Sequence, residues 1–145
     1  MLTVQQLLSG KRTNTIISVR PDQAVIEALE IMSTHNIGAV LVLQDERLVG
    51  IFSERDYARK GILKDRKAKS TPISEVMTGG VIVVSPKQTI DDCMQIMSER
   101  HFRHLPVLDG EQVVGILSIS DIVTAIIREQ ANRIQSLEQY ITGTY

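Results

Sequence analysis

Residues 15–59 read TIISVRPDQAVIEALEIMSTHNIGAVLVLQDERLVGIFSERDYAR, and residues 80–124 read GVIVVSPKQTIDDCMQIMSERHFRHLPVLDGEQVVGILSISDIVT. The two stretches align without a gap at an offset of 65 residues, and 15 of the 45 aligned residues are identical. Identity at this level without an insertion indicates an internal duplication. A two-fold repeat brings equivalent residues face to face, so a site at the joint is expected to occur twice.

Each repeat carries the pattern of a strand, a helix, two strands and a second helix. After Pro21, which suits a helix's first turn, Val25, Leu29 and Met32 recur at helical spacing. Residues 39–43 are apolar without alternation, which is typical of a strand buried on both faces. We therefore expect an α/β (α+β) fold of two β-α-β-β-α repeats related by pseudo-two-fold symmetry, plus a C-terminal helix.

The repeats define the expected domain bounds. Repeat 1 is predicted at residues 8–62, a linker at 63–79, repeat 2 at 80–126 and a C-terminal helical extension at 127–145, together one module. The linker region is polar and basic, and its run of Lys and Arg from Lys60 to Lys69 is typical of a solvated loop. The alternative is an electropositive rim that draws anions toward a nearby site.

The C-terminal helix carries an apolar pattern of its own. Ile127, Ile134 and Ile141 are spaced by seven residues. Val123, Ile126, Gln130 and Leu137 fill in the same stripe. This spacing approximates a short coiled-coil seam and favours a partner helix from a second copy, with packing onto the chain's own body as the alternative.

Composition excludes several classes of function. The chain has 145 residues, a net charge of −1 and 43% hydrophobic residues, which is typical of a soluble domain without the basic excess of a nucleic-acid binder. A single Cys cannot form an internal disulfide, which fits a reducing compartment. No secretory signal is evident, and the longest apolar run is too short to span a membrane. A cytoplasmic location is therefore predicted. We find no nucleophile paired with a base and no pair of catalytic carboxylates, so no catalytic residue is assigned and no enzyme is expected. A metal site at His101 and His104 is disfavoured because Glu99 is the only acid nearby.

The local motif with the most chemistry is Gly-x-x-Ser-x-x-Asp, at residues 50–56 and again at 115–121. Ser-x-x-Asp is a helix-capping pattern, and this structural interpretation is a serious alternative to any functional one. A functional site is favoured by the glycine, which permits close approach to a strand, and by the free amides of a helix N-terminus, which attract anions. A carboxylate at such a turn can also hold the two hydroxyls of a ribose.

Taken together, these features resemble a tandem cystathionine-β-synthase (CBS) domain pair, the Bateman module, from about residue 8 to 126. The resemblance is carried by the duplication, the two Gly-x-x-Ser-x-x-Asp elements, the RHLPV stretch at 103–107 and the SEVMT stretch at 74–78. It implies that adenosine-containing ligands (AMP, ADP, ATP, sometimes NAD or S-adenosylmethionine) bind in clefts between the repeats. It also implies assembly as a homodimer.

The resemblance further implies two crossed clefts. The first combines Ser53 and Asp56 with Gly80, Val81, Ile82, Arg103 and His104. The second combines Ser118 and Asp121 with Thr15, Ile16, Ile17, Gly38 and Ala39. Asp56 would hold the ribose, Ser53 the ribose or α-phosphate, and Arg103 with His104 the phosphates. Because repeat 1 has Gly38 and Ala39 at the equivalent positions, we expect the Asp56 cleft to prefer phosphorylated ligands and the Asp121 cleft to accept a neutral adenosine moiety or a second ligand.

The function expected from the resemblance is that of a stand-alone adenine-nucleotide sensor without a catalytic cofactor, with AMP as the first expected ligand. It would signal to an unknown client protein through a ligand-dependent rearrangement of the repeats or of the dimer, without a membrane or nucleic-acid partner. The alternative is a structural dimerisation module whose clefts are empty or vestigial.

Overall fold

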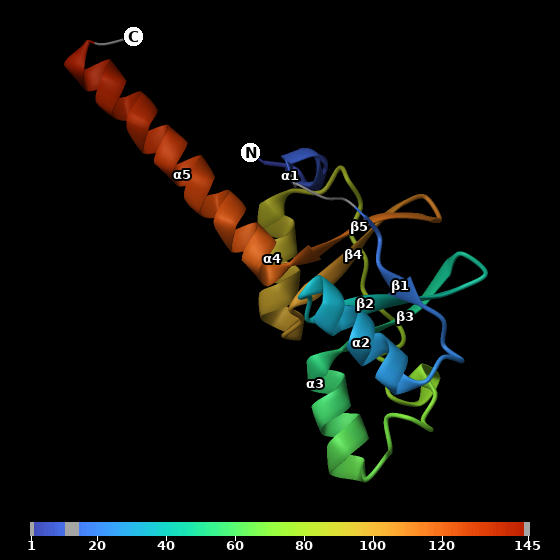
Figure 1. Cartoon of the computed structure of the whole chain (residues 1–145). Coiled ribbons are helices and arrows are strands. Elements are labelled where there is room, and N and C mark those ends of the chain that lie inside the picture. Colours follow the sequence, from blue (N-terminus) through green and yellow to red (C-terminus); the bar gives the residue numbers. More distant parts are fainter. Residues whose placement is uncertain (1, 11–14, 144–145) are drawn as a thin grey trace.

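The computed structural model describes residues 2–10 and 15–143, which form two similar halves with one long helix leaving the body (Figure 1). The expected domains at 8–62 and 127–145 include residues 11–14 and 144–145, which lie outside the described residues. In chain order the elements are α1 (Val4–Gly10), β1 (Ser18–Val19), α2 (Val25–His35), β2 (Ala39–Gln44), β3 (Arg47–Ser53), α3 (Glu54–Asp56), short helical turns at Tyr57–Gly61, Ile62–Lys64 and Ile73–Glu75, α4 (Ile90–Arg100), β4 (His104–Asp109), β5 (Gln112–Ser118) and α5 (Ile119–Thr142). The mixed fold with a C-terminal helix is confirmed.

Each half is built on an antiparallel hairpin with a bulge in the same place. β2 pairs with β3 and β4 with β5, and the register shifts just after Val42 and just after Val107, which are equivalent residues. In the first half β1 adds a parallel strand beside β2. In the second half the expected first strand is reduced to one parallel bridge between Val84 and Val107.

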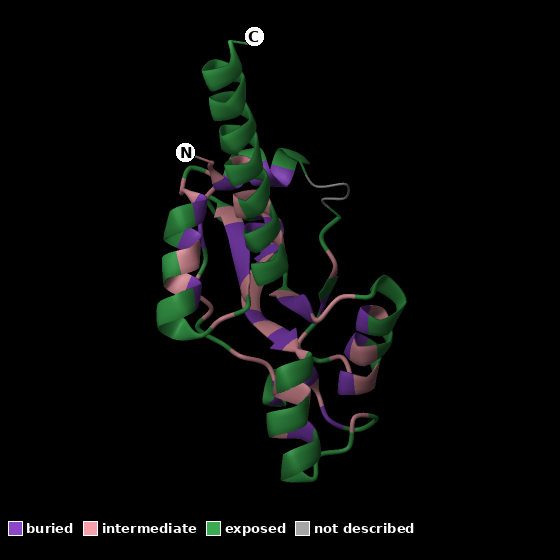
Figure 2. Cartoon of the chain, turned by 90° about the vertical axis from the view of Figure 1, so that its left-hand side faces the viewer, coloured by how far each residue is buried: buried purple, intermediate pink, exposed green. Residues whose placement is uncertain are grey.

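Each half has its own hydrophobic core between helix and hairpin (Figure 2). The predicted helical stripe is confirmed in α2, where Val25 and Met32 are buried, and in α4, where Cys93 and Met97 are buried. Phe52 of β3 is fully buried in the first core. Burial of these apolar faces is the main stabilising term, at about 25 cal/mol for each Å² of apolar surface removed from water.

The segment before each repeat packs on the other repeat. Val4 of α1 lies in the second core, and Ile73 of the expected linker lies in the first. The two segments make equivalent backbone bonds: the Val4 N–H donates to the Gln88 carbonyl at 2.8 Å, and the Ile73 N–H donates to the Gln23 carbonyl at 2.8 Å. Ile73, in the second part of the predicted linker, is therefore a core residue. Each half is completed by the segment that precedes the other repeat.

The helices that follow the two hairpins differ in length. In the first half α3 continues through short turns only to Lys64, whereas α5 runs for 24 residues. The first helix stops at Asp65, whose φ of 57° lies in the left-handed region that ends helices. No such break occurs in α5, which projects from the body (Figure 1).

Candidate functional site

Both Ser-x-x-Asp motifs form reciprocal capping boxes at helix N-termini. At α5 the Asp121 N–H donates to Ser118 Oγ at 3.1 Å, and the Ser118 N–H donates to Asp121 Oδ2 at 2.8 Å. The Ser53–Asp56 pair makes the same two bonds at α3, at 3.1 and 3.0 Å. The capping interpretation is therefore correct at both motifs, and any role in binding is additional to it.

The Asp56 carboxylate is also bound by the segment that leads into the second repeat. Thr78 Oγ1 donates to Asp56 Oδ1 at 3.0 Å, and Lys60 Nζ lies 3.5 Å from the same oxygen. Lys60 Nζ also donates to Thr78 Oγ1 at 3.3 Å, which closes a small network. Because the Asp56 side chain is only 13% exposed, the protein's own groups take up much of this carboxylate's hydrogen-bonding capacity.

The glycine of the first motif makes room for this contact. Ile51 and Thr78 exchange two backbone hydrogen bonds, at 3.0 and 2.8 Å. A Cβ at the neighbouring Gly50 would lie 2.9 Å from the Thr78 carbonyl oxygen. The close approach expected at this glycine is therefore made by the protein's own backbone.

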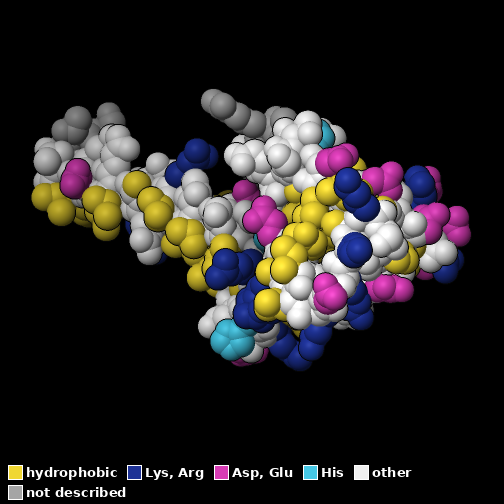
Figure 3. All heavy atoms as spheres, turned by 60° about the horizontal axis from the view of Figure 1, so that its bottom comes forward, with side chains coloured by type: hydrophobic (Ala, Val, Ile, Leu, Met, Phe, Trp, Pro, Cys, Tyr) yellow, Lys and Arg dark blue, Asp and Glu magenta, His cyan; other side chains and the backbone are white. Residues whose placement is uncertain are grey.

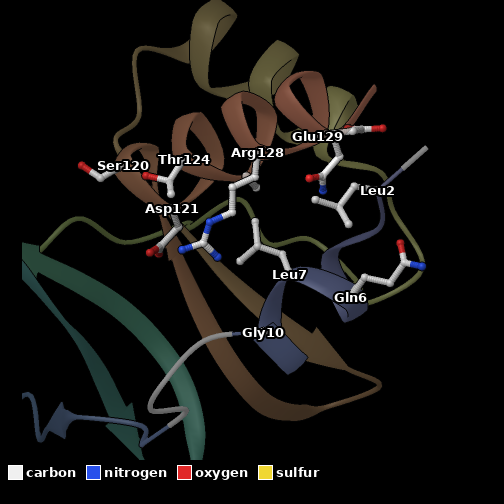
Figure 4. A pocket seen from close by; sticks show the side chains of 11 residues that line it. Leu2, Gln6, Leu7, Gly10, Ser120, Asp121, Thr124, Arg128 and Glu129 are labelled. Carbon is white, nitrogen blue, oxygen red and sulfur yellow. The ribbon is translucent and has the colours of Figure 1, made fainter. Parts of the chain in front are cut away.

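The second motif opens onto a cavity of about 560 Å³ (Figure 4). Such a volume lies in the range of small-molecule sites. One wall comes from α5 and the other from α1; the lining residues are Leu2, Gln6, Leu7, Gly10, Ser120, Asp121, Thr124, Ala125, Arg128, Glu129 and Asn132. Figure 4 shows the Arg128 guanidinium extending toward the Asp121 carboxylate along the same helix face. The cavity therefore offers an acidic group at a helix N-terminus beside a basic group.

Sequence reasoning missed Arg128, Lys60 and Thr78. Arg128 follows Asp121 by seven residues and Lys60 follows Asp56 by four, and both spacings place the residues on one helix face. That spacing could have identified both basic residues. Although the second cleft has no residue equivalent to Arg103, it has Arg128, so the basis for expecting a neutral ligand there is weakened.

The entry residues Gly80 and Val81 line a different hollow. A cavity of about 410 Å³ is formed by Arg47, Leu48, Val49, Gly80, Val81, Val83, Leu108, Gly110 and Glu111. Arg47 begins β3, whereas Ser53 ends it. Of the residues expected together in the first cleft, Gly80 and Val81 thus lie toward the hairpin turns, while Ser53 and Asp56 lie at the opposite end of β3.

His104 lies against Gly38, although the two residues were expected in different clefts. A Cβ at Gly38 would lie 3.9 Å from the His104 ring. Within its own hairpin His104 pairs with Ser118, as Ala39 pairs with Ser53. His104 is thereby placed beside the second motif, and its contact with Gly38, whose carbonyl accepts the Glu54 N–H, places it near the first motif as well.

The other predicted site residues take supporting positions. The Gly38 carbonyl accepts from the Glu54 N–H at 3.1 Å, and the Arg103 carbonyl accepts from the Ile119 N–H at 2.9 Å, so both cap the helices that carry the motifs. The Arg103 side chain is exposed. Of the remaining predicted residues, Thr15 and Ile16 are exposed, Ile17 and Ile82 are half-buried and Ala39 is buried.

Comparison with known proteins places this geometry in a family. The model of the CBS domain matches twice, over residues 12–62 and 73–128. The chain belongs to the CBS domain family. The CBS domain-containing protein CBSX3, mitochondrial, of Arabidopsis thaliana is 37% identical over 129 residues, which cover 86% of this chain and 63% of that relative.

Solved CBS structures share the fold. The CBS domain structure NE2398 matches with a TM-score of 0.83 and 45% identity over 88% of this chain and 99% of that one. The CBS domain pair of protein MJ0100, solved in complex with 5′-methylthioadenosine and S-adenosyl-L-methionine, matches with a TM-score of 0.79 and 27% identity over 89% of this chain and 98% of that one. CBS pairs of this kind are regulatory ligand-binding modules.

His104 makes the stability of this CBS pair depend on pH. Burial lowers the pKa of His104 below 6.5; Asp121 and Glu54 raise it and Arg103 lowers it further. In the unfolded chain the pKa returns to about 6.5, so between that value and the lower folded pKa the unfolded state binds a proton that the folded state does not. The free energy of unfolding is therefore expected to fall as the pH drops through 6.5, by at most about 1.4 kcal/mol per pH unit from this group.

Denaturant unfolding at pH 7.5 and 5.5 checks this expectation. His104→Gln should lose less stability between the two pH values than the wild type does. An equal loss in wild type and His104→Gln would contradict the assignment.

Two further candidate groups take structural positions. Cys93 is buried in the second core, and burial raises the pKa of its thiol to about 11. His101 is an exposed helix C-cap with a positive φ of 57°. Within residues 2–10 and 15–143, no three His, Cys, Asp or Glu side chains gather as metal ligands, and no helix is long and apolar enough to cross a membrane.

Proposed function

We propose that this CBS pair is a regulatory module that binds an adenosine-containing ligand in the cavity beside Asp121. One observation carries the proposal: the cavity of about 560 Å³ contains the Asp121 carboxylate and the Arg128 guanidinium on one helix face. The carboxylate can accept hydrogen bonds from both ribose hydroxyls, and the guanidinium can bind a phosphate through two parallel hydrogen bonds. The ligands of the MJ0100 pair, both built on adenosine, support this class.

A ligand in the Asp56 cleft is proposed to compete with contacts that the chain itself makes. Its carboxylate is bound by Thr78 at 3.0 Å and lies 3.5 Å from Lys60. A ribose would have to replace these contacts, so part of the binding free energy would be lost in breaking them. A phosphorylated ligand is proposed to use Arg128 in the Asp121 cavity, whereas the sequence assigned the phosphates to Arg103 and His104 of the Asp56 cleft.

Binding in the cavity would act on the relative position of α1 and α5. These helices form the two walls, and α1 reaches the second core from the start of the chain. A ligand that contacts both walls stabilises the arrangement in which they are close and so shifts the population toward it. We propose a regulatory rather than catalytic role, read out by a client protein or by a second copy; the cytoplasmic location stays a prediction.

A structural dimerisation module is the second candidate, because both Asp side chains already act as helix caps. A thermal-shift screen with AMP, ADP, ATP, NAD and S-adenosylmethionine distinguishes the two. A ligand that binds only the folded state at 100 times its Kd adds about 2.7 kcal/mol of stability and raises the Tm. No shift with any of the five would favour the structural role.

Arg128→Gln tests the proposed phosphate contact. A hydrogen bond to a charged group contributes about 1.5–3 kcal/mol, so AMP affinity should fall about 10- to 100-fold. Adenosine affinity should stay the same, since adenosine has no phosphate. Calorimetry with both ligands measures the two effects, and Arg100→Gln, an exposed arginine of α4, is the control for a general loss of positive charge. An equal loss for AMP and adenosine would contradict the phosphate role.

A further inference from the structure

The outer half of α5 has no covering within the described chain. Every residue from 131 to 143 is exposed, on all sides of the helix (Figure 2). Isolated helices shorter than about 12–15 residues are marginal in water, and most helical stability in proteins comes from packing of an apolar face. A helix that extends beyond its body in this way therefore needs a partner surface.

The apolar side chains of this helix lie along one edge. Steps of four and three residues connect Val123, Ile127, Gln130, Ile134, Leu137 and Ile141. Ile127 is 61% exposed and Ile141 80%, whereas the neighbouring Ile122 is fully buried in the second core. Figure 3 shows apolar side chains as a strip along the projecting helix. We call these six residues the α5 seam; it is separate from the face that packs on the body.

The residue types in the α5 seam indicate which helix packs against it. Ile127, Ile134 and Ile141 occupy one heptad position, and Val123, Gln130 and Leu137 occupy the other. The three Ile at the first position meet the preference of parallel two-stranded coiled coils for β-branched residues there. At the second position Leu137 is the one Leu, and Gln130 is a single polar residue of the kind that specifies register. This composition fits a second copy of the same helix.

The charged residues on either side of the seam indicate the relative orientation of the two α5 helices. Arg133 and Glu138 lie on opposite sides of the seam and five residues apart. In a parallel, in-register pair Arg133 faces Glu138 of the second copy on both sides, whereas an antiparallel pair brings like residues together. Arg133 also lies 3.8 Å from Glu129 of its own helix, but both side chains are more than a third exposed, so this pair contributes little and leaves Arg133 available.

We propose that α5 forms a parallel, in-register two-stranded coiled coil with α5 of a second copy, through the α5 seam. This inference does not depend on ligand binding. It does bring the two Asp121 cavities to the base of one shared coiled coil, because each cavity and each seam lie on the same helix.

Cysteine cross-linking of the full chain tests the orientation. Ile127→Cys and Ile141→Cys should each form a disulfide-linked dimer on mild oxidation. An antiparallel pair can self-cross-link at no more than one of two positions 14 residues apart, so success at both demands a parallel arrangement. Gln139→Cys, on the outer face, and the wild type, whose buried Cys93 has a thiol pKa of about 11, should not cross-link.

Charge exchange tests the register by sedimentation equilibrium. Glu138→Arg should raise the dimer dissociation constant about five- to tenfold at low salt, because two favourable pairs become repulsive. Adding Arg133→Glu to the same chain should restore the wild-type constant. A dimer that withstands Glu138→Arg and cross-links at neither seam position would overturn the proposal and indicate contact through the body; a monomer, or cross-linking at one position only, would overturn it as well.

Discussion

Replacing Asp121 by alanine is expected to lower the affinity for AMP and for S-adenosylmethionine by at least about 100-fold. Hydrogen bonds to a charged group contribute about 1.5–3 kcal/mol, and a ribose diol can make two of them to one carboxylate. The loss should be the same for both ligands, because the ribose is the part that they share. Titration calorimetry of the wild type and Asp121→Ala measures it.

The control has to separate binding from capping, since Asp121 also caps α5. Asp92 offers a match: it forms the same reciprocal box with Thr89 at the start of α4, with both bonds at 3.1 Å, and is exposed. Asp92→Ala should cost about 1 kcal/mol of stability, as loss of a cap usually does, and leave ligand affinity unchanged. Equal losses of affinity in Asp92→Ala and Asp121→Ala would show that capping, not ligand contact, explains the effect.

Replacing Gly50 by alanine is expected to lower the free energy of unfolding by about 2–3 kcal/mol, toward the upper end of the usual cost of overpacking. The new Cβ would lie 2.7 Å from Met77 Sδ and 2.9 Å from the Thr78 carbonyl oxygen. That carbonyl cannot move freely, because it accepts the Ile51 N–H at 3.0 Å. The substitution should also separate Thr78 from Asp56.

Gly115→Ala provides the matched control in the second repeat. Its Cβ would lie 2.9 Å from Leu8 Cδ2, and the close atoms all belong to the end of that flexible side chain. Because a leucine tip can change rotamer, we expect a loss below about 1 kcal/mol. Urea unfolding of both variants measures the difference through the midpoint at constant slope. Equal losses, or a larger loss in Gly115→Ala, would contradict the account of Gly50.

The elements of the fold were predictable because their patterns are local. The stripe of Val25 and Met32 and the apolar run of β2 were each contained within a few turns or one strand. Duplication then made the second repeat predictable from the first. The reduced first strand of the second repeat was not predictable. The residues around Val84 have the sequence pattern of a strand, whereas in the structure Val84 pairs only through one bridge to Val107.

The candidate site was predictable in its motifs and not in its partners. Ser118 and Asp121 could be identified from three-residue spacing, and Arg128 from helical spacing had it been sought. Thr78 could not be assigned to Asp56 by spacing, since the two side chains are 22 residues apart and meet only because the segment before repeat 2 packs on repeat 1.

The sequence by itself determined two β-α-β-β-α repeats, two capped helix N-termini that carry an acidic group, and an apolar heptad pattern on the last helix. Periodicity and capping are properties of neighbouring residues, so they can be read along the chain. Only the tertiary structure decided that the segment before each repeat packs on the other repeat, and that Thr78 and Lys60 contact the Asp56 carboxylate. It also decided that Asp121 lines a cavity between α1 and α5. These outcomes depend on which distant segments bury their apolar residues together, and that choice is made by packing of the whole molecule rather than by any local pattern.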